Sequence, residues 1–127
     1  MLQFLNAFFL IFHTALVLFN VLGWMFTKTL RWNLVTLALT AASWGLMGIK
    51  YGLGYCLCTD WHWQVRQALG IHDQARTFIQ LLVFQFSGWL PSEQLASSLT
   101  ASFFFVSLFA SVTLNIRKSW NALATKG

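Results

Sequence analysis

Long runs without a single charged side chain limit what this chain can fold into. The first Asp, Glu, Lys or Arg is Lys28, and residues 32–49, 77–92 and 94–116 are also free of charge. A helix that crosses a bilayer needs about 20 apolar residues, within a range of about 17 to 25. Three of the runs reach that length, and the run at 77–92 is marginal. The sequence therefore predicts a helical membrane protein.

Composition supports this prediction and argues against a separate soluble domain. Hydrophobic residues make up 57% of the 127 residues and charged residues 9%, whereas soluble domains carry about a quarter charged residues. The longest less apolar stretch, 59–76, is too short to build its own core. The start, MLQFLNAFF, lacks a basic signal-peptide region, so we expect the first helix to remain in the mature protein. The net charge of +5 comes from residues scattered among helix ends, which indicates topology signals and no nucleic acid partner.

The predicted fold is an all-α, polytopic bundle that forms a single membrane domain over residues 1–127. We place four transmembrane helices at about 3–26, 32–55, 73–90 and 93–116, and a short amphipathic interfacial helix at about 60–69 between the second and third. Pro91 ends the third helix, and Ser92 is a good N-cap for the fourth.

Four spans would put both termini and the 59–76 connection on one side of the membrane. That side would hold Arg66, Arg76, Arg117, Lys118 and Lys126, against Lys28 and Arg31 on the other. The positive-inside rule then predicts that both termini are cytoplasmic. If the run at 73–90 does not span, the last helix reverses and this prediction loses its basis.

Polar and small residues recur along the predicted spans at helical spacing. On the first helix Asn6, His13 and Asn20 are seven residues apart, and the second carries a similar stripe through Asn33, Thr36, Thr40 and Ser43. Polar and small side chains prefer other helices to lipid. We therefore predict helix packing, within the bundle or against a partner subunit, by a set of seven residues: Asn6, His13, Asn20, Gly48 and Gly52 (a G-x-x-x-G pair), Ser107 and Ser111.

His13 is the candidate cofactor-binding residue. An ionisable side chain in the middle of a span is costly and marks a candidate functional site. His13 could be a haem ligand, a proton relay or a hydrogen-bond donor to a quinone, or a neutral histidine that holds the bundle in register. No second histidine is expected at the bilayer centre, because His62 and His72 fall in a connection. We predict no resident cofactor, with haem or quinone as the alternatives.

The segment from Cys56 to His62 reads C-x-C-x-D-x-H, which looks like a metal site but lacks the usual C-x-x-C spacing. We predict no metal here. The cysteines would close the second helix, Asp60 or Thr59 would cap the interfacial helix, and Trp61 and Trp63 would anchor it at headgroup depth. Arg66 could reach lipid phosphates. Contact with lipid or a partner is thus assigned to Cys56, Thr59, Asp60, Trp61, Trp63 and Arg66.

Three stretches of this sequence resemble a known family. They are FHTALVLFNVLG, GYCLCTDWHWQVRQALG and RTFIQ, and they are similar to the bacterial membrane family called domain of unknown function 2784. The matching positions are His13, Phe19, Gly23, Cys56, Thr59, Arg66, Gly70 and Ile79. Leu57 and Cys58 depart from that family's Cys-Pro-Leu-Thr motif, and Asn33 stands where many members have a histidine. The resemblance implies the membrane architecture and a shared role for His13, Cys56, Thr59 and Arg66.

These features lead to one functional prediction and two alternatives. The chain has three acidic residues and no catalytic triad or phosphate loop, so we predict no enzyme. We expect a multi-pass protein of the bacterial inner membrane that binds lipids and acts as an accessory or stabilising subunit of a larger membrane complex. The alternatives are a haem- or quinone-binding redox protein that uses His13, and a lipid-binding or transport homo-oligomer. The last would require the polar stripes of the first two helices to line a cavity.

Overall fold

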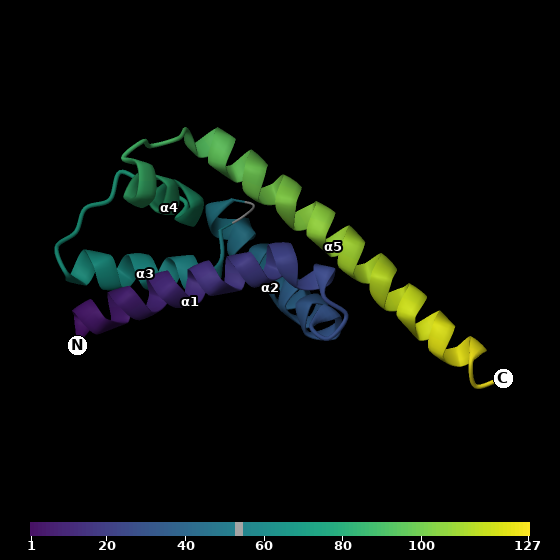
Figure 1. Cartoon of the computed structure of the whole chain (residues 1–127). Helices are drawn as coiled ribbons and strands as arrows, with labels where there is room; N and C mark the ends of the chain where they lie inside the picture. Colours follow the sequence, from purple (N-terminus) through teal and green to yellow (C-terminus); the bar gives the residue numbers. More distant parts are fainter. Residues whose placement is uncertain (53–54) are drawn as a thin grey trace.

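The computed structural model describes residues 1–52 and 55–127 and contains helices joined by short connections (Figure 1). The helices are α1 (Leu2–Leu22), the 3₁₀ turn η1 (Gly23–Met25), α2 (Leu30–Tyr51), α3 (Leu57–Ala68), α4 (Phe78–Ser87) and α5 (Glu93–Ala124). No strand occurs in these described ranges. The all-α prediction is confirmed.

Three helical segments are long and apolar enough to cross a membrane, and the predicted four spans are wrong. The three are Leu2–Met25, Leu30–Tyr51 and Glu93–Ala124. In place of the span expected at 73–90, α4 has 10 residues, about 15 Å of helix. Thr77 caps its start, and Gly88 ends it with a left-handed backbone at φ 72°. The placement of both termini in the cytoplasm depended on four spans and therefore loses its basis.

The short helix α3 starts earlier than predicted and turns its polar side inward. Its N-cap is Cys56 rather than Asp60 or Thr59, and the Leu57 amide donates to Ser43 Oγ on α2 at 2.9 Å. The cysteines therefore open α3 instead of closing α2. The helix packs along the first half of α1 (Figure 1). Thr59 and His62 are buried, whereas Trp61 is 48% exposed.

The helices α2 and α5 form the second packed pair of the bundle. Leu37, Trp44 and Phe104 make its apolar core, with the Trp44 and Phe104 rings 4.4 Å apart. Ser107 and Ser111 are both buried on α5, as expected of small residues at a helix contact. The predicted end of this helix at 116 is wrong, because α5 continues to Ala124 and projects past the other helices (Figure 1).

Asparagines bond the first two helices to each other and to α5. Asn20 Nδ2 donates to Thr40 Oγ1 at 2.9 Å, and Asn33 Nδ2 donates to the Phe19 carbonyl at 2.7 Å. A Cβ at Gly23 would lie 2.8 Å from the Asn33 amide nitrogen, so glycine permits this close approach. Asn115 Nδ2 donates to the Leu30 carbonyl at 3.1 Å. Polar side chains thus hold the bundle together at its interior, as their spacing predicted.

Gly52 of the predicted G-x-x-x-G pair makes no close helix contact within the described residues. Gly52 is exposed, ends α2 with φ 94° and has no described atom within 4 Å of its Cβ position. Gly48, one turn earlier, is half-buried, and its carbonyl accepts the Gly52 amide at 3.1 Å. Gly52 is the residue that ends α2, where a positive φ is accessible to glycine at little cost.

Candidate functional site

His13, Cys56 and Thr59 meet in the interior although 43 residues separate the first two. Cys56 Sγ lies 3.3 Å from His13 Nε2 and 3.0 Å from Thr59 Oγ1. One face of the imidazole stacks on Phe78 from α4, with ring centroids 3.8 Å apart. Three helices therefore fix the histidine ring: α1 carries it, the start of α3 hydrogen-bonds it and the start of α4 covers it.

The cluster borders a cavity of about 500 Å³. Volumes of this size, largely apolar with a few polar groups, are typical of small-molecule sites. The polar stripe of α1 contributes His13 and Asn20, and that of α2 contributes Thr36, Thr40 and Ser43. Apolar residues form most of the rest of the wall, among them Phe12, Leu16, Val17, Val21, Leu39, Trp44, Phe78 and Phe104.

Two polar groups in the cavity wall lack a hydrogen-bond partner within the described residues. They are His13 Nδ1 and Asn20 Oδ1, and both side chains are buried. Leaving a buried polar group unpaired costs about 1–3 kcal/mol, so such groups call for an explanation. If the Cys56 thiol donates to Nε2, the neutral imidazole carries its proton on Nδ1 and offers a free donor.

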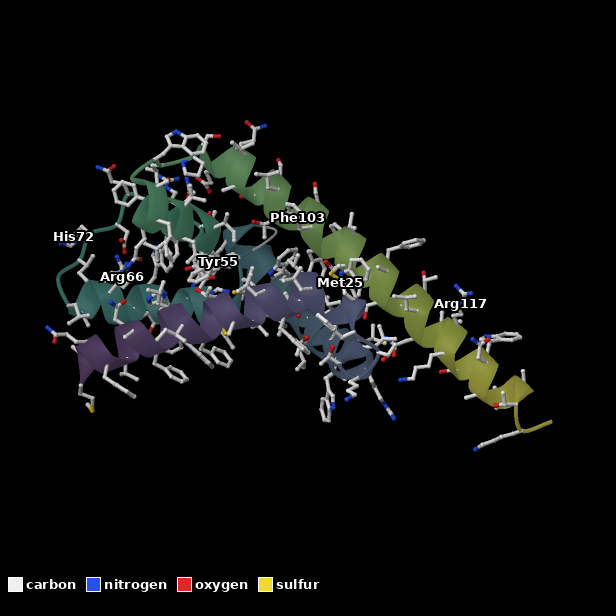
Figure 2. All side chains as sticks on the ribbon, viewed as in Figure 1. Met25, Tyr55, Arg66, His72, Phe103 and Arg117 are labelled. Carbon is white, nitrogen blue, oxygen red and sulfur yellow. The ribbon has the colours of Figure 1, made fainter. Side chains whose placement is uncertain are left out.

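A second polar cluster lies at the end of the bundle near the N-terminus. Arg66 makes two bonds of 2.6 Å to the carboxylate of Asp73, and both side chains are nearly buried. Asn6 Oδ1 lies 2.9 Å from His62 Nε2 and accepts from Arg66 Nη1 at 3.2 Å. Burial, with a smaller contribution from the Arg66 charge, lowers the pKa of His62 to about 4. Figure 2 shows Arg66 on α3 facing the connection that leads to α4.

This cluster revises the interpretation of Arg66 and His62. Arg66 was expected to face lipid phosphates, and its guanidinium is instead engaged by Asp73 and Asn6. His62 was placed in a connection outside the bilayer centre, and the structure shows it on α3, fully buried against α1. Gly70 lies between Arg66 and Asp73, and its φ of 74° lets the chain turn back so that the two side chains meet. A glycine at this position was the sequence feature that could have suggested the pair.

The remaining residues of the predicted contact set serve α3 locally. Asp60 accepts hydrogen bonds from Gln64 at 2.7 Å and from the Tyr55 hydroxyl at 3.4 Å. Trp63 packs against the core formed by Ala75, Phe78 and Leu81.

Burial, followed by the neighbouring Cys56, raises the pKa of the Cys58 thiol. In the described part of the chain, no three His, Cys, Asp or Glu side chains converge as metal ligands.

The start of α4 was missed by the sequence analysis. Thr77 Oγ1 accepts from the Gln80 amide at 3.2 Å, and Gln80 Oε1 accepts from the Thr77 amide at 3.0 Å. This is a capping box, for which Thr77-x-x-Gln80 is the sequence signal. Gln80 Nε2 also donates to the Pro91 carbonyl at 2.9 Å. The box fixes the first turn of α4, and hence Phe78, against His13.

Fold and cavity together define a small helical protein with three apolar helices of membrane-spanning length and an internal site beside a buried histidine. Residues 3–116 match the family model described as "Protein of Unknown function (DUF2784)", and the chain belongs to that family. No curated protein and no solved structure matches the chain.

Proposed function

We propose that this protein binds a lipophilic small molecule inside the membrane, in the cavity beside His13. The observation that carries the proposal is the convergence of the α1 and α2 polar stripes on one cavity of about 500 Å³. The wall combines apolar residues suited to a chain or ring with a few buried polar groups suited to a head group. His13 lines this cavity, and its buried Nδ1 has no partner among the described residues.

Hydrogen bonding suits this histidine better than haem ligation. His13 Nε2 already contacts Cys56 Sγ, and Phe78 covers one ring face. Of the residues that line the cavity in the described chain, His13 is the one histidine, whereas a b-type haem commonly takes two axial side chains. The proposal is therefore a quinone or a lipid, bound without a chemical reaction. The accessory-subunit role stays a prediction, since no contact in the structure favours it.

The test is to identify what the protein retains on purification. We expect an extract of the native protein in mild detergent to contain a lipophile at near-stoichiometric amounts by mass spectrometry. His13→Leu should reduce the retained amount at least about tenfold, the effect of losing about 1.4 kcal/mol of binding. A Trp61→Leu variant, changed at an exposed residue outside the cavity wall, serves as the control. The control should retain as much lipophile as the native protein. Native protein that carries no lipophile, or no more than the His13→Leu variant, would contradict the proposal.

We also infer an orientation in the bacterial inner membrane from the three spans. The turn between α1 and α2 and the C-terminal end carry Lys28, Arg31, Arg117, Lys118 and Lys126 and no acid. The opposite side carries three basic residues, Lys50, Arg66 and Arg76, and three acids, Asp60, Asp73 and Glu93. Lys118 Nζ donates to the Thr27 carbonyl at 3.2 Å, so these two ends are adjacent. The positive-inside rule favours a cytoplasmic C-terminus and an N-terminus on the other side.

A further inference from the structure

Two short helices begin at the wall of the His13 cavity and run away from it. The helix α3 has 12 residues and α4 has 10. In each, the cavity is lined by the first turn alone, Leu57 to Thr59 in α3 and Phe78 to Ile79 in α4, together with the N-cap residues Cys56 and Thr77. Two helix N-termini therefore meet at one internal space.

A helix N-terminus presents unpaired amides and a partial positive charge. Some of these amides are used: Leu57 donates to Ser43 Oγ, and Gln80 donates to Thr77 Oγ1. Among the described residues, the amides of Thr59, Phe78 and Ile79 have no acceptor in the protein. The two termini thus add donors and positive potential to the same part of the wall.

The buried side chains of the wall point to a ligand independently of the helix termini. His13 is 5% exposed and Asn20 is 8% exposed, both line the cavity, and each has one unbonded polar atom. Phe78 stacks on His13 at 3.8 Å, so the histidine lies directly beside the first turn of α4. His13 and the first turn of α4 therefore border the same part of the cavity.

No Asp, Glu, Lys or Arg lines this cavity in the described part of the chain. An ammonium head group would find no carboxylate there and would face the positive ends of two helices. A carbonyl or carboxylate oxygen would instead meet donors and positive potential. The two helix termini therefore favour an acceptor oxygen over an ammonium group in the ligand. No ionised side chain at the wall offsets their positive potential.

We infer that the ligand's head group is a hydrogen-bond-accepting oxygen, the carboxylate of a single-chain lipid or the ring carbonyl of a quinone, held beside His13 between the N-termini of α3 and α4. The inference rests on the proposed function and adds the chemical class of the ligand. The apolar part of the ligand then lies along Leu16, Leu39 and Phe104, which line the same cavity.

Trp44 gives this inference a direct measurement. Its side chain is buried and lines the cavity, so a brominated ligand in the cavity quenches its fluorescence. The full-length protein in detergent is titrated with dibromostearic acid, its methyl ester, and the matching dibromo alcohol and amine. A short-chain quinone is tested by competition. The difference between the native protein and Trp44→Phe isolates the signal from the other six of the seven tryptophans.

We expect the acid or the quinone to bind at least about tenfold more tightly than the alcohol and the amine. A preference for the acid over its ester identifies a charged carboxylate, whereas equal binding of acid and ester with strong competition by the quinone identifies a neutral carbonyl. Amine or alcohol binding as tight as that of the acid would overturn the inference and leave the proposed function standing. The absence of Trp44-dependent quenching by every probe would overturn the proposed function itself.

Discussion

At the scale of single residues, the buried pair of Arg66 and Asp73 is the strongest charge contact in the structure. Its two bonds of 2.6 Å are bidentate, and the side chains are 12% and 11% exposed. Bidentate pairs of this type combine charge with fixed geometry. The pair ties the end of α3 to the connection before α4, so it holds in place both short helices that reach the cavity.

Removing one partner of this pair leaves a buried charge uncompensated. We predict that Arg66→Ala lowers the free energy of unfolding by about 3 kcal/mol, measured by denaturant titration in mixed micelles. The control is Arg76→Ala, because the Arg76–Glu93 pair is longer, at 3.6 Å, and exposed, and such pairs contribute little. Equal losses in the two variants would show that the Arg66 pair contributes no more than a surface contact.

Through His62 the stability of the protein depends on pH, and the lowered pKa of its ring sets the direction of this dependence. Its pKa is lowered from 6.5 to about 4, so the folded state favours the neutral ring. Above pH 6.5 the full stability is present, and it falls as the pH drops from 6.5 toward 4, because protons bind the unfolded chain more tightly. The groups that face the ring are Arg66, Asp73, Asn6 and His13.

We therefore predict that the thermal midpoint in detergent decreases between pH 7 and pH 5, and that His62→Gln flattens this decrease. Glutamine can keep a hydrogen bond to Asn6 without titrating in that window. His72, labelled in Figure 2, is exposed in the connection after α3. The His72→Gln variant is the matched control and should retain the native slope. An unchanged slope in His62→Gln would assign the effect to another group.

At the scale of elements, α4 depends on its capping box. Thr77→Ala removes the acceptor for the Gln80 amide, and we predict a loss of about 1 kcal/mol in stability with faster hydrogen exchange in α4. Thr77→Ser keeps the hydroxyl and should behave like the native protein. Unchanged exchange in α4 after Thr77→Ala would mean that packing against His13 alone fixes this helix.

The sequence predicted some elements well and others poorly, for physical reasons. The uncharged runs before Lys28 and after Glu93 identify α1 and α5, because span length is a local property of the chain. The end of the third predicted helix near Pro91 is close to the observed end at Ser87, but the helix starts at Phe78 rather than near residue 73. Hydropathy does not register the Thr77 cap that sets this late start.

In the candidate site, too, the sequence predicted features that depend on local spacing and missed contacts between distant segments. The polar spacing of His13 and Asn20 predicted their inward orientation, since a polar face avoids lipid. The contact of His13 with Cys56 and Phe78 depends on packing between distant segments, which spacing does not encode. For the same reason the sequence did not predict the burial of His62: its partner Asn6 lies 56 residues away on another helix.

At the scale of the whole molecule, the orientation proposed above puts the two ends of the chain on opposite sides of the membrane. We predict that green fluorescent protein fused after Gly127 fluoresces, because it folds in the cytoplasm. Alkaline phosphatase fused after His72 should be active, because it needs the opposite side. The reciprocal fusions are the controls. Fluorescence from a fusion at His72 would contradict the proposed orientation.

The position of α3 and α4 between α1 and α5 also has a consequence for biogenesis. Neither short helix is a candidate span, so the insertion machinery has no signal to hold them at the membrane. Cys56 and Phe78 both contact His13 on α1, and Gln80 bonds the Pro91 carbonyl just before α5. Since α5 leaves the ribosome after the other four helices and supplies Ser97, Thr100 and Phe104 to the wall, the cavity is completed only once α5 has packed against them, and the binding site forms only at that late stage of assembly.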